Sequence, residues 1–210
     1  MHPEQPHGEI IRHMEEHYAP VEKNAFHEIV PGDPSVSIHL IPPTPTRPWT
    51  TLFTAGMSDK PMTVPQGYEE YRFAELMIHL PPDWPLSLEA FDDRNHFWPV
   101  RMLKKIASLP HLTDSWLGPP PTIISNDDPP EPFAPNTEFT CVMLLLEDAE
   151  KGRLKTEDGR VILLHWMLPL YTEERDLEQK AGLPRLFELF DRYEVPMVVD
   201  INRVNVAKEA

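Results

Sequence analysis

The segments FTCVMLLL, residues 139–146, and VILLHWML, residues 161–168, are apolar at both odd and even positions. A strand with two apolar faces is covered on both sides, so both segments are candidates for central strands of a sheet. Between them, Asp158-Gly159 is a strong signal for a tight hairpin turn. The sequence therefore predicts that these two segments form the buried centre of a sheet.

The segment NDDPPEPFAP, residues 126–135, directly precedes the first of these strands and packs four prolines and three carboxylates into ten positions. It could be a flexible linker between two domains or a fixed loop of one domain. Prolines stiffen the backbone, and the segment lies between a short extended piece and a central strand, so a fixed loop is favoured. Because no other stretch is typical of a linker, residues 1–210 are predicted to form a single compact domain.

Further strands are predicted upstream from alternating apolar residues. In residues 35–41, Val36, Ile38 and Leu40 share one face. Residues 49–56 place Trp49, Thr51 and Phe53 opposite Leu52, and residues 72–80 place Ala74, Leu76, Ile78 and Leu80 on one face. Residues 25–30 and 197–200 are predicted to be short strands as well.

Helices are predicted at three places. Residues 7–18, within an N-terminal helical region 1–20, carry Ile10, Ile11, Met14 and Tyr18 on one face. Residues 98–108 have Pro99 at the first helical position, and a C-terminal helix follows the break at Gly182. The tail 205–210 is expected to fray. This order of elements predicts an α+β fold, with helices flanking a mixed or mostly antiparallel central sheet.

The formal charge of −15 argues against binding to nucleic acid or to an anionic membrane surface. It would steer a cationic partner toward the chain, or it could serve solubility alone. A single cysteine, Cys141, allows no intramolecular disulfide and fits a reducing compartment. The N-terminus lacks the features of a signal peptide. The protein is therefore predicted to be cytoplasmic.

His13 and His17 are the leading candidate metal ligands, since the acidic residues lack the spacing and the glycine of a calcium loop. His13 and His17 lie one helical turn apart, but the zinc-protease pattern is absent and no third ligand is evident. A metal-dependent hydrolase that uses this pair with an acidic loop remains the alternative hypothesis. His39, His79 and His165 lie in predicted strands and are expected to be structural, hydrogen-bonded residues, with His165 buried and neutral.

No nucleophile, cofactor loop or catalytic cluster stands out. Cys141 lies within an apolar strand, where burial makes a thiol inert. A serine elbow, a phosphate-binding loop and a dinucleotide fingerprint are all absent from the sequence. We therefore expect no enzyme activity, no bound metal and no cofactor.

Aromatic residues beside prolines are the remaining candidates for function, namely Trp49, Trp84, Trp98, Trp116 and Phe133. If exposed, rings and carboxylates on stiff loops suit a protein-binding surface, because little entropy is lost on docking. Alternatively, the rings simply fill the edges of the core. The predicted partner-binding residues are Trp116, Asp127, Asp128, Glu131 and Phe133.

Several blocks in order, among them TLFTAGMSDKPM, AELMIHLPPDWP, WPVRMLKKIASLPH, WLGPPPTI, NDDPPEPFAPNTEF, LPLYTEE and VVDINR, resemble the bacterial suppressor-of-fused domain proteins. The resemblance runs from about residue 25 to residue 205. It implies a compact α+β fold without a catalytic role, similar to the amino-terminal half of the animal Hedgehog-pathway regulator, which binds and restrains a transcription factor.

The resemblance also implies a partner. Bacterial members are thought to be immunity proteins that neutralise a toxin by binding it, and the acidic charge suits a basic toxin. In the animal protein a peptide strand is held between two domains with the help of an aspartate. This chain corresponds to one of those domains, and the resemblance places an acidic residue of the 126–131 loop near the comparable position. The partner's identity and the oligomeric state stay open.

Overall fold

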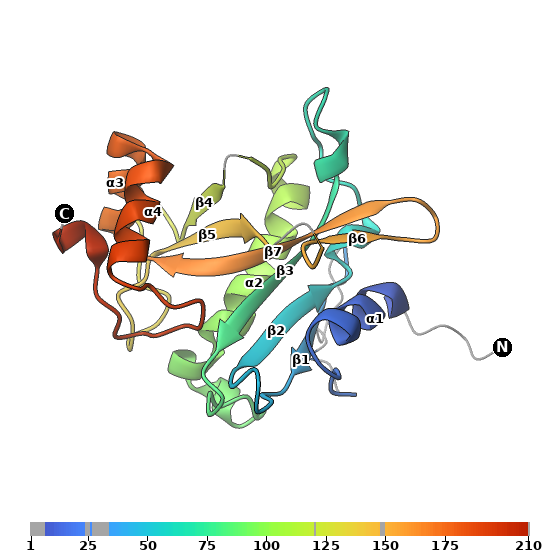
Figure 1. The fold of residues 1–210 in the computed structure, drawn as a ribbon, viewed down its shortest axis with the longest axis horizontal. Coiled ribbons are helices and arrows are strands. Elements are labelled where there is room, and N and C mark those ends of the chain that lie inside the picture. Colours follow the sequence, from blue (N-terminus) through green and yellow to red (C-terminus); the bar gives the residue numbers. More distant parts are fainter. Residues whose placement is uncertain (1–6, 24–25, 27–33, 120, 148–149, 210) are drawn as a thin grey trace.

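The computed structural model describes residues 7–23, 26, 34–119, 121–147 and 150–209. Within these residues, one open seven-stranded sheet is flanked by four α-helices (Figure 1). The strands are β1 (Ser37–Ile41), β2 (Thr50–Ala55), β3 (Phe73–Leu80), β4 (Thr122–Ser125), β5 (Cys141–Leu146), β6 (Arg153–Lys155) and β7 (Val161–Leu170). The helices are α1 (Gly8–His17), α2 (Arg94–Thr113), α3 (Thr172–Ala181) and α4 (Leu183–Arg192), with 3₁₀ turns η1 (Met57–Asp59), η2 (Glu69–Tyr71), η3 (Ala90–Asp92) and η4 (Val206–Glu209).

The sheet is mixed, and its strand order is β1-β2-β3-β7-β5-β4. Only β3 and β7 pair in parallel, and every other pair is antiparallel. β6 forms the predicted hairpin with β7 around Asp158-Gly159. The α+β class, the single compact domain and the two buried central strands are confirmed. No helix within the described residues is long and apolar enough to span a membrane.

Each face of the sheet packs against different helices. On one face, α2 covers Leu52 and the predicted stripe of β3, which confirms the alternation in that strand. On the other face, α1 packs over the β1–β3 end of the sheet, and α4 packs over β5 and β7. Figure 1 shows α1 and the α3–α4 pair at opposite ends of the molecule.

Helix α2 begins four residues before the prediction. Asp93 caps it by accepting a hydrogen bond from the Asn95 N–H at 2.8 Å. Pro99 therefore lies in the second turn, where its missing N–H leaves the Asn95 carbonyl without a helical partner. That carbonyl accepts instead from the Asn136 amide at 3.3 Å. The predicted start at Pro99 is wrong because a side chain distant in sequence compensates for the proline.

The C-terminal segment also differs from expectation. Residues 197–200 are not a strand, and residues 205–209 are not frayed, because η4 forms there with Val206 buried. Arg203 binds the buried Glu174 through two hydrogen bonds of 2.6 Å, and its carbonyl accepts from the Tyr171 hydroxyl. This buried ion pair fixes the tail against α3. Of the predicted strand 25–30, only Phe26 lies within the described residues, and it bridges to Ile38.

Candidate partner-binding surface

The outer strands on the main path of the sheet are β1 and β4, while β6 pairs with β7 alone in a short branch. Among the described residues, other segments of the chain bond to the outer side of β1. Along β1, the Phe26 N–H donates to the Ile38 carbonyl at 2.8 Å, and the Ile38 N–H donates to Phe26 at 3.1 Å. The Glu22 N–H donates to the Leu40 carbonyl at 2.8 Å. The outward N–H and C=O of Ile38 and the outward C=O of Leu40 are therefore satisfied.

Strand β4 pairs with β5 on one side, and its other side is open within the described residues. The Asn126 N–H donates to the Thr140 carbonyl at 2.8 Å, which fixes the register at the end of the strand. In an antiparallel pair, alternate residues bond to the neighbour, so Thr122 and Ile124 also face β5. The backbone N–H and C=O groups of Ile123 and Ser125 thus point away from the sheet.

The loop after β4 is closed by a single side chain. Asn126 is buried, and its backbone carbonyl accepts a hydrogen bond from the Glu131 N–H at 2.7 Å. The side-chain amide of Asn126 donates from Nδ2 to the Glu131 carbonyl at 2.9 Å. Its Oδ1 accepts a hydrogen bond from Lys105 of α2 at 3.0 Å. Residues 126–131 are therefore held at both ends, and the predicted fixed loop is confirmed.

Phe133 anchors the second half of the loop and corrects one expectation. We expected an exposed ring, but Phe133 is 0% exposed and stacks on Trp98, with ring centroids 5.3 Å apart. Its backbone N–H donates to Phe139, and its carbonyl accepts from Arg101 at 2.6 Å. Phe133 cannot contact a partner in the folded protein, because its ring is part of the core. This agrees with the alternative interpretation that the rings beside prolines fill the edges of the core.

The acidic residues of the loop point to solvent. Asp127, Asp128 and Glu131 are all exposed, and Asp127 adopts a left-handed backbone conformation with φ of 75°. The nearest cation is Lys105, whose Nζ lies 3.8 Å from the Asp127 carboxylate. Both side chains are exposed to solvent, which screens this ion pair. Three carboxylates thus stand on a rigid loop at the C-terminal end of β4.

An aromatic cluster lies at the other end of β4. The Trp116 ring packs against Tyr68 and Tyr71, with centroid distances of 5.0 and 5.8 Å. Tyr68 is 40% exposed, and Trp116 and Tyr71 are half-buried. A Cβ on Gly118 would lie 1.8 Å from the Trp116 ring, so only glycine allows this ring position. We name Tyr68, Tyr71 and Trp116 the aromatic cluster.

The remaining candidate rings are divided. Trp98 is 1% exposed and belongs to the core, whereas Trp49 and Trp84 are half-buried. Trp84 donates its indole N–H to the His96 carbonyl at 3.0 Å, which holds the ring against α2. The sequence did not reveal Tyr68 and Tyr71, although their spacing of three residues after Gly67 would have suggested two rings on one side of a turn.

His13 and His17 contact each other with tilted rings whose centroids lie 4.4 Å apart, but they do not form a metal site with the acidic loop. His13 is buried and donates from Nε2 to the Lys151 carbonyl at 2.8 Å, and burial lowers its pKa. The described residues contain no cluster of three or more His, Cys, Asp or Glu side chains that could hold a metal ion. The hydrolase hypothesis therefore lacks its ligand set in this part of the chain.

The strand histidines differ from one another. His79 is buried, and its Nδ1 forms a hydrogen bond of 2.9 Å with the Thr51 hydroxyl, to which Arg47 also donates. His165 is 3% exposed, and neither ring nitrogen has a hydrogen-bond partner within the described residues. Burial lowers the pKa of both rings to about 4. His165 is buried and neutral as predicted, but the expected hydrogen bond is missing.

Two further buried groups are structural. Glu75 is 0% exposed and accepts hydrogen bonds from Thr54, from the Gly56 N–H and from both the N–H and the hydroxyl of Ser58. Burial raises the pKa of this carboxyl, and the four donors oppose the rise. Cys141 is a buried free thiol, as predicted.

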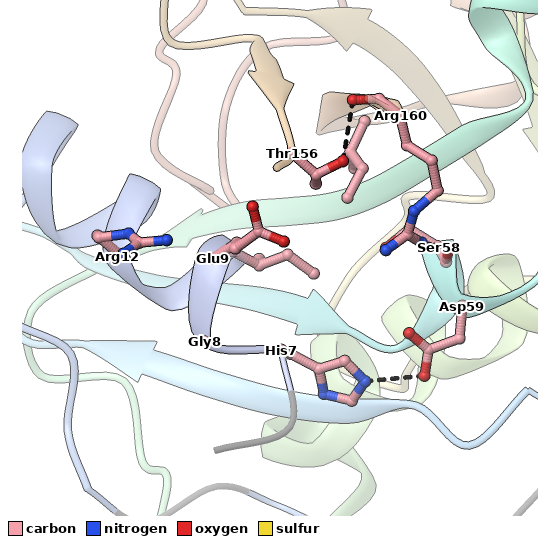
Figure 2. Close-up of a pocket in the computed structure, with 10 residues that line it drawn as sticks. His7, Gly8, Glu9, Arg12, Ser58, Asp59, Thr156 and Arg160 are labelled. Atoms are coloured by element: carbon pink, nitrogen blue, oxygen red, sulfur yellow. Dashed lines mark hydrogen bonds and ion pairs between the residues drawn. The ribbon is translucent and has the colours of Figure 1, made fainter. Parts of the chain in front are cut away.

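Figure 2 shows a polar pocket of about 280 Å³ between α1, η1 and the β6–β7 hairpin. Its charged groups pair with one another or with nearby residues. His7 contacts Asp59 at 2.9 Å, and Arg160 donates to the Ser58 carbonyl at 3.0 Å. The Glu9 carboxylate accepts from the Glu157 N–H at 2.7 Å. These contacts dock the N-terminal helix onto the sheet.

Comparisons with known proteins point to one family. The family model described as Suppressor of fused protein (SUFU) matches residues 32–204. No curated protein sequence matches the chain.

Solved structures show the same fold. A suppressor of fused homologue from Neisseria gonorrhoeae is 16% identical with a TM-score of 0.66, over 96% of both chains. A chain of a Sufu–Fu complex is 13% identical with a TM-score of 0.67, over 99% of this chain and 94% of its own. Drosophila Suppressor of Fused is 13% identical with a TM-score of 0.60, and the match covers 95% of this chain but 51% of the Drosophila chain. This chain therefore spans about half the length of the Drosophila protein.

Proposed function

The chain belongs to the suppressor of fused family, and from this premise we propose that it is a non-catalytic protein that binds and sequesters a protein partner. We infer that residues 1–210 act as a single domain of this kind in the cytoplasm. A relative of similar fold has been solved in a Sufu–Fu complex, which supports a protein as the class of partner.

The open edge of β4 is the observation that carries this proposal. An unpaired edge with outward N–H and C=O groups is a template for a strand from another chain. The outward groups of Ile123 and Ser125 would give affinity through main-chain hydrogen bonds, while side chains of the partner would be recognised at either end. The β1 edge is less suitable, because Phe26 and Glu22 already bond to it. β6 has only three residues and offers a shorter edge.

The two ends of β4 provide different kinds of recognition. At the C-terminal end, Asp127, Asp128 and Glu131 form an acidic site on a loop held by Asn126. At the N-terminal end, Trp116 supplies an aromatic anchor of the type that dominates binding energy. Phe133 contributes indirectly, because its buried ring packs on Trp98 and anchors the loop to the core. Both ends are fixed before binding, so little conformational entropy is lost when a partner docks.

The charge of the chain favours a basic partner. A formal net charge of −15 raises the encounter rate with a cationic protein, and the acidic loop lies at the proposed surface. We propose an immunity-type inhibitor, which neutralises a basic toxin by covering its surface, over other forms of regulation. A metal-dependent hydrolase that uses His13 and His17 is the second candidate. It would require ligands from outside the described residues.

The experiment is a binding assay with a basic, toxin-like partner, which is sought first among the products of the neighbouring genes. The two proteins are purified separately, and affinity is measured by calorimetry for wild type, for Trp116→Ala and for the triple variant Asp127→Asn/Asp128→Asn/Glu131→Gln. We expect the triple variant to bind at least about tenfold more weakly, because several close charge pairs are lost. Trp116→Ala should lose about tenfold or more as a central aromatic anchor.

The matched control removes the same charge elsewhere. Glu16, Glu22 and Glu157 are exposed carboxylates, two on or near α1 and one in the β6–β7 turn, away from β4. The variant Glu16→Gln/Glu22→Gln/Glu157→Gln should bind like wild type at physiological salt. An equal loss in both triple variants would mean that net charge alone drives binding, and unchanged affinity in every variant would remove this surface from the interface.

A further inference from the structure

The open edge of β4 is bounded on both sides by residues that cannot extend it. Pro121 directly precedes the strand and has no N–H. Asp127, two residues after the strand, has a left-handed backbone with φ of 75°. The outward groups that a partner strand can pair with are therefore those of Ile123 and Ser125, which lie symmetrically about Ile124. An occupant that matches this edge has an equally short edge with the same spacing.

A second copy of the chain offers such an edge. In an antiparallel pair, opposed residues exchange both backbone hydrogen bonds. With a two-fold axis beside Ile124, Ile123 of each copy would oppose Ser125 of the other. An axis beside Ile123 would oppose Ser125 to Pro121, which lacks an N–H. An axis beside Ser125 would oppose Ile123 to Asp127, whose backbone is not extended. Only the register centred on Ile124 pairs every outward group of β4.

The charges beside β4 favour the antiparallel orientation. Asp127, Asp128 and Glu131 are exposed and stand beyond the C-terminal end of the strand. Parallel pairing would place two such loops side by side, and like charges in close juxtaposition are costly at an interface. A two-fold axis beside Ile124 sends the loops to opposite ends of the pair. Each acidic loop would then adjoin the N-terminal end of the other β4, where the aromatic cluster lies.

The side chains of β4 also suit a second copy. Ile124 is half-buried and packs at the edge of the core on the α2 side of the sheet. Directly opposed residues that do not exchange hydrogen bonds are the closest pairs of an antiparallel sheet, so two Ile124 side chains would cover each other. The Ser125 hydroxyl accepts from Arg175 of α3 at 2.9 Å and brings no unpaired polar group to the pair.

Pairing through β4 would end at two copies. On the main path of the sheet, the outer strands of such a pair would be the two copies of β1. Phe26 and Glu22 already bond to the outer side of β1. The same patch serves both copies, so the contact closes on itself and does not propagate along this path.

We propose that the free chain forms a weak two-fold dimer in which β4 pairs antiparallel with β4 of a second copy, centred on Ile124. The short edge and the charge of −15 on each copy limit the affinity. The dissociation constant is about 0.1 mM, so the edge is open in dilute solution. The pairing needs no other partner. Its consequence, that a partner strand displaces the second copy, rests on the proposed function.

Sedimentation equilibrium of the full chain without any partner tests the dimer. Ile123→Pro removes one N–H per copy, and by symmetry it breaks two hydrogen bonds of the pair. The dimer dissociation constant should rise about tenfold or more relative to Ile123→Ala. Raising the salt from about 0.1 M to about 1 M should strengthen the wild-type dimer, because it screens the repulsion between two acidic copies. Binding of a basic partner should instead weaken with salt.

Cysteine substitutions test the register. Ile124→Cys places two thiols opposite each other, at a Cα separation within the range of a disulfide. Thr122→Cys is the matched control, because it lies on the same face of the same strand but opposes Asn126 of the second copy. In a glutathione redox buffer, Ile124→Cys should form a linked dimer and Thr122→Cys should not. Cys141 stays in place, since it is fully buried.

Wild type that remains monomeric at a chain concentration of about 1 mM overturns the proposal. Equal dissociation constants for Ile123→Pro and Ile123→Ala also overturn it, as does cross-linking of Thr122→Cys as readily as of Ile124→Cys. Circular dichroism checks the folding of each variant. If one variant does not fold, sedimentation of wild type still decides the question. None of these results touches the proposed function, whose assay measures the affinity of a separate protein partner.

Discussion

The edge strands β1 and β4 differ in how their outward backbone groups are treated. At β1, Phe26 bonds to both outward backbone groups of Ile38, and Glu22 bonds to the Leu40 carbonyl. At β4, the outward groups of Ile123 and Ser125 have no such cover within the described residues, and the strand is instead framed by an acidic loop and an aromatic cluster. An exposed edge is a liability for aggregation. The proposed function assigns the uncovered β4 edge to a protein partner.

The largest expected effect concerns the rigidity of the frame. Phe133→Ala removes a fully buried ring that stacks on Trp98, and it should lower the free energy of unfolding by about 3–5 kcal/mol. Urea unfolding followed by fluorescence measures the change. Phe187→Ala, at a half-buried ring on α4, is the control and should cost clearly less. Equal losses would mean that the loop beside β4 is not anchored as described.

The second effect concerns pH and separates the two histidines. His79 and His165 have pKa values of about 4 in the folded protein, against 6.5 when unfolded. The unfolded chain therefore binds protons first, so stability is full above pH 6.5 and is lost as pH falls from 6.5 to 4. The loss is about 3 kcal/mol for each histidine at pH 4.

Denaturant unfolding between pH 7 and pH 4 tests this account. His165→Leu should remove the contribution of one histidine and leave that of His79, so the variant loses less stability on acidification. Glu75, whose pKa is raised by burial, contributes equally to both proteins and cancels in the difference. Identical pH dependence in wild type and variant would show that His165 is not held neutral by burial.

The third prediction compares the edges directly through proline, which removes one N–H. Ile38→Pro breaks the hydrogen bond to Phe26, and relative to Ile38→Ala it should cost about a further 1–3 kcal/mol. Ile123→Pro removes an outward N–H, and relative to Ile123→Ala it should cost little, since proline is tolerated at the open side of an edge strand. The alanine variants correct for the lost side chains, and thermal or urea unfolding gives all four values.

The smallest effect on stability is expected at the acidic loop. The variant Asp127→Asn/Asp128→Asn/Glu131→Gln should change the free energy of unfolding by less than about 0.5 kcal/mol per site, because the carboxylates are exposed and weakly paired. Calorimetric unfolding checks this. A large loss would show that these carboxylates hold the fold, and a loss of partner affinity could then no longer be assigned to direct contact.

The sequence predicted what depends on neighbouring residues. Alternation in residues 72–80 identified the face of β3 that packs on α2, and the prolines of residues 126–135 indicated a fixed loop. Residues 197–200 were wrongly predicted as a strand. In the structure, the Val199 N–H donates to the His79 carbonyl at 2.9 Å, a contact with a residue far away in sequence. The depth of Phe133 depends on Trp98, which lies far away in sequence and offers no local signal.

The candidate surface was predicted only in part. Proline and carboxylate content indicated the acidic loop, and Trp116 was identified from its turn. The openness of β4 could not be foreseen, because the sequence does not show which strands become edges. The sequence also does not show that residues 22 and 26 bond to the edge at β1 and leave β4 as the open one. The unpaired imidazole of His165 is likewise a property of the packed structure, since a sequence does not show which side chains lie opposite.

Amide hydrogen exchange of the free protein tests the central claim most directly. If β4 is an open edge, the N–H groups of Ile123 and Ser125 exchange orders of magnitude faster than the N–H of Ile38, which donates to Phe26 at 3.1 Å. Binding of the partner should then slow exchange at Ile123 and Ser125 and leave Ile38 unchanged. Protection of Ile123 and Ser125 equal to that of Ile38 in the free chain would contradict the account.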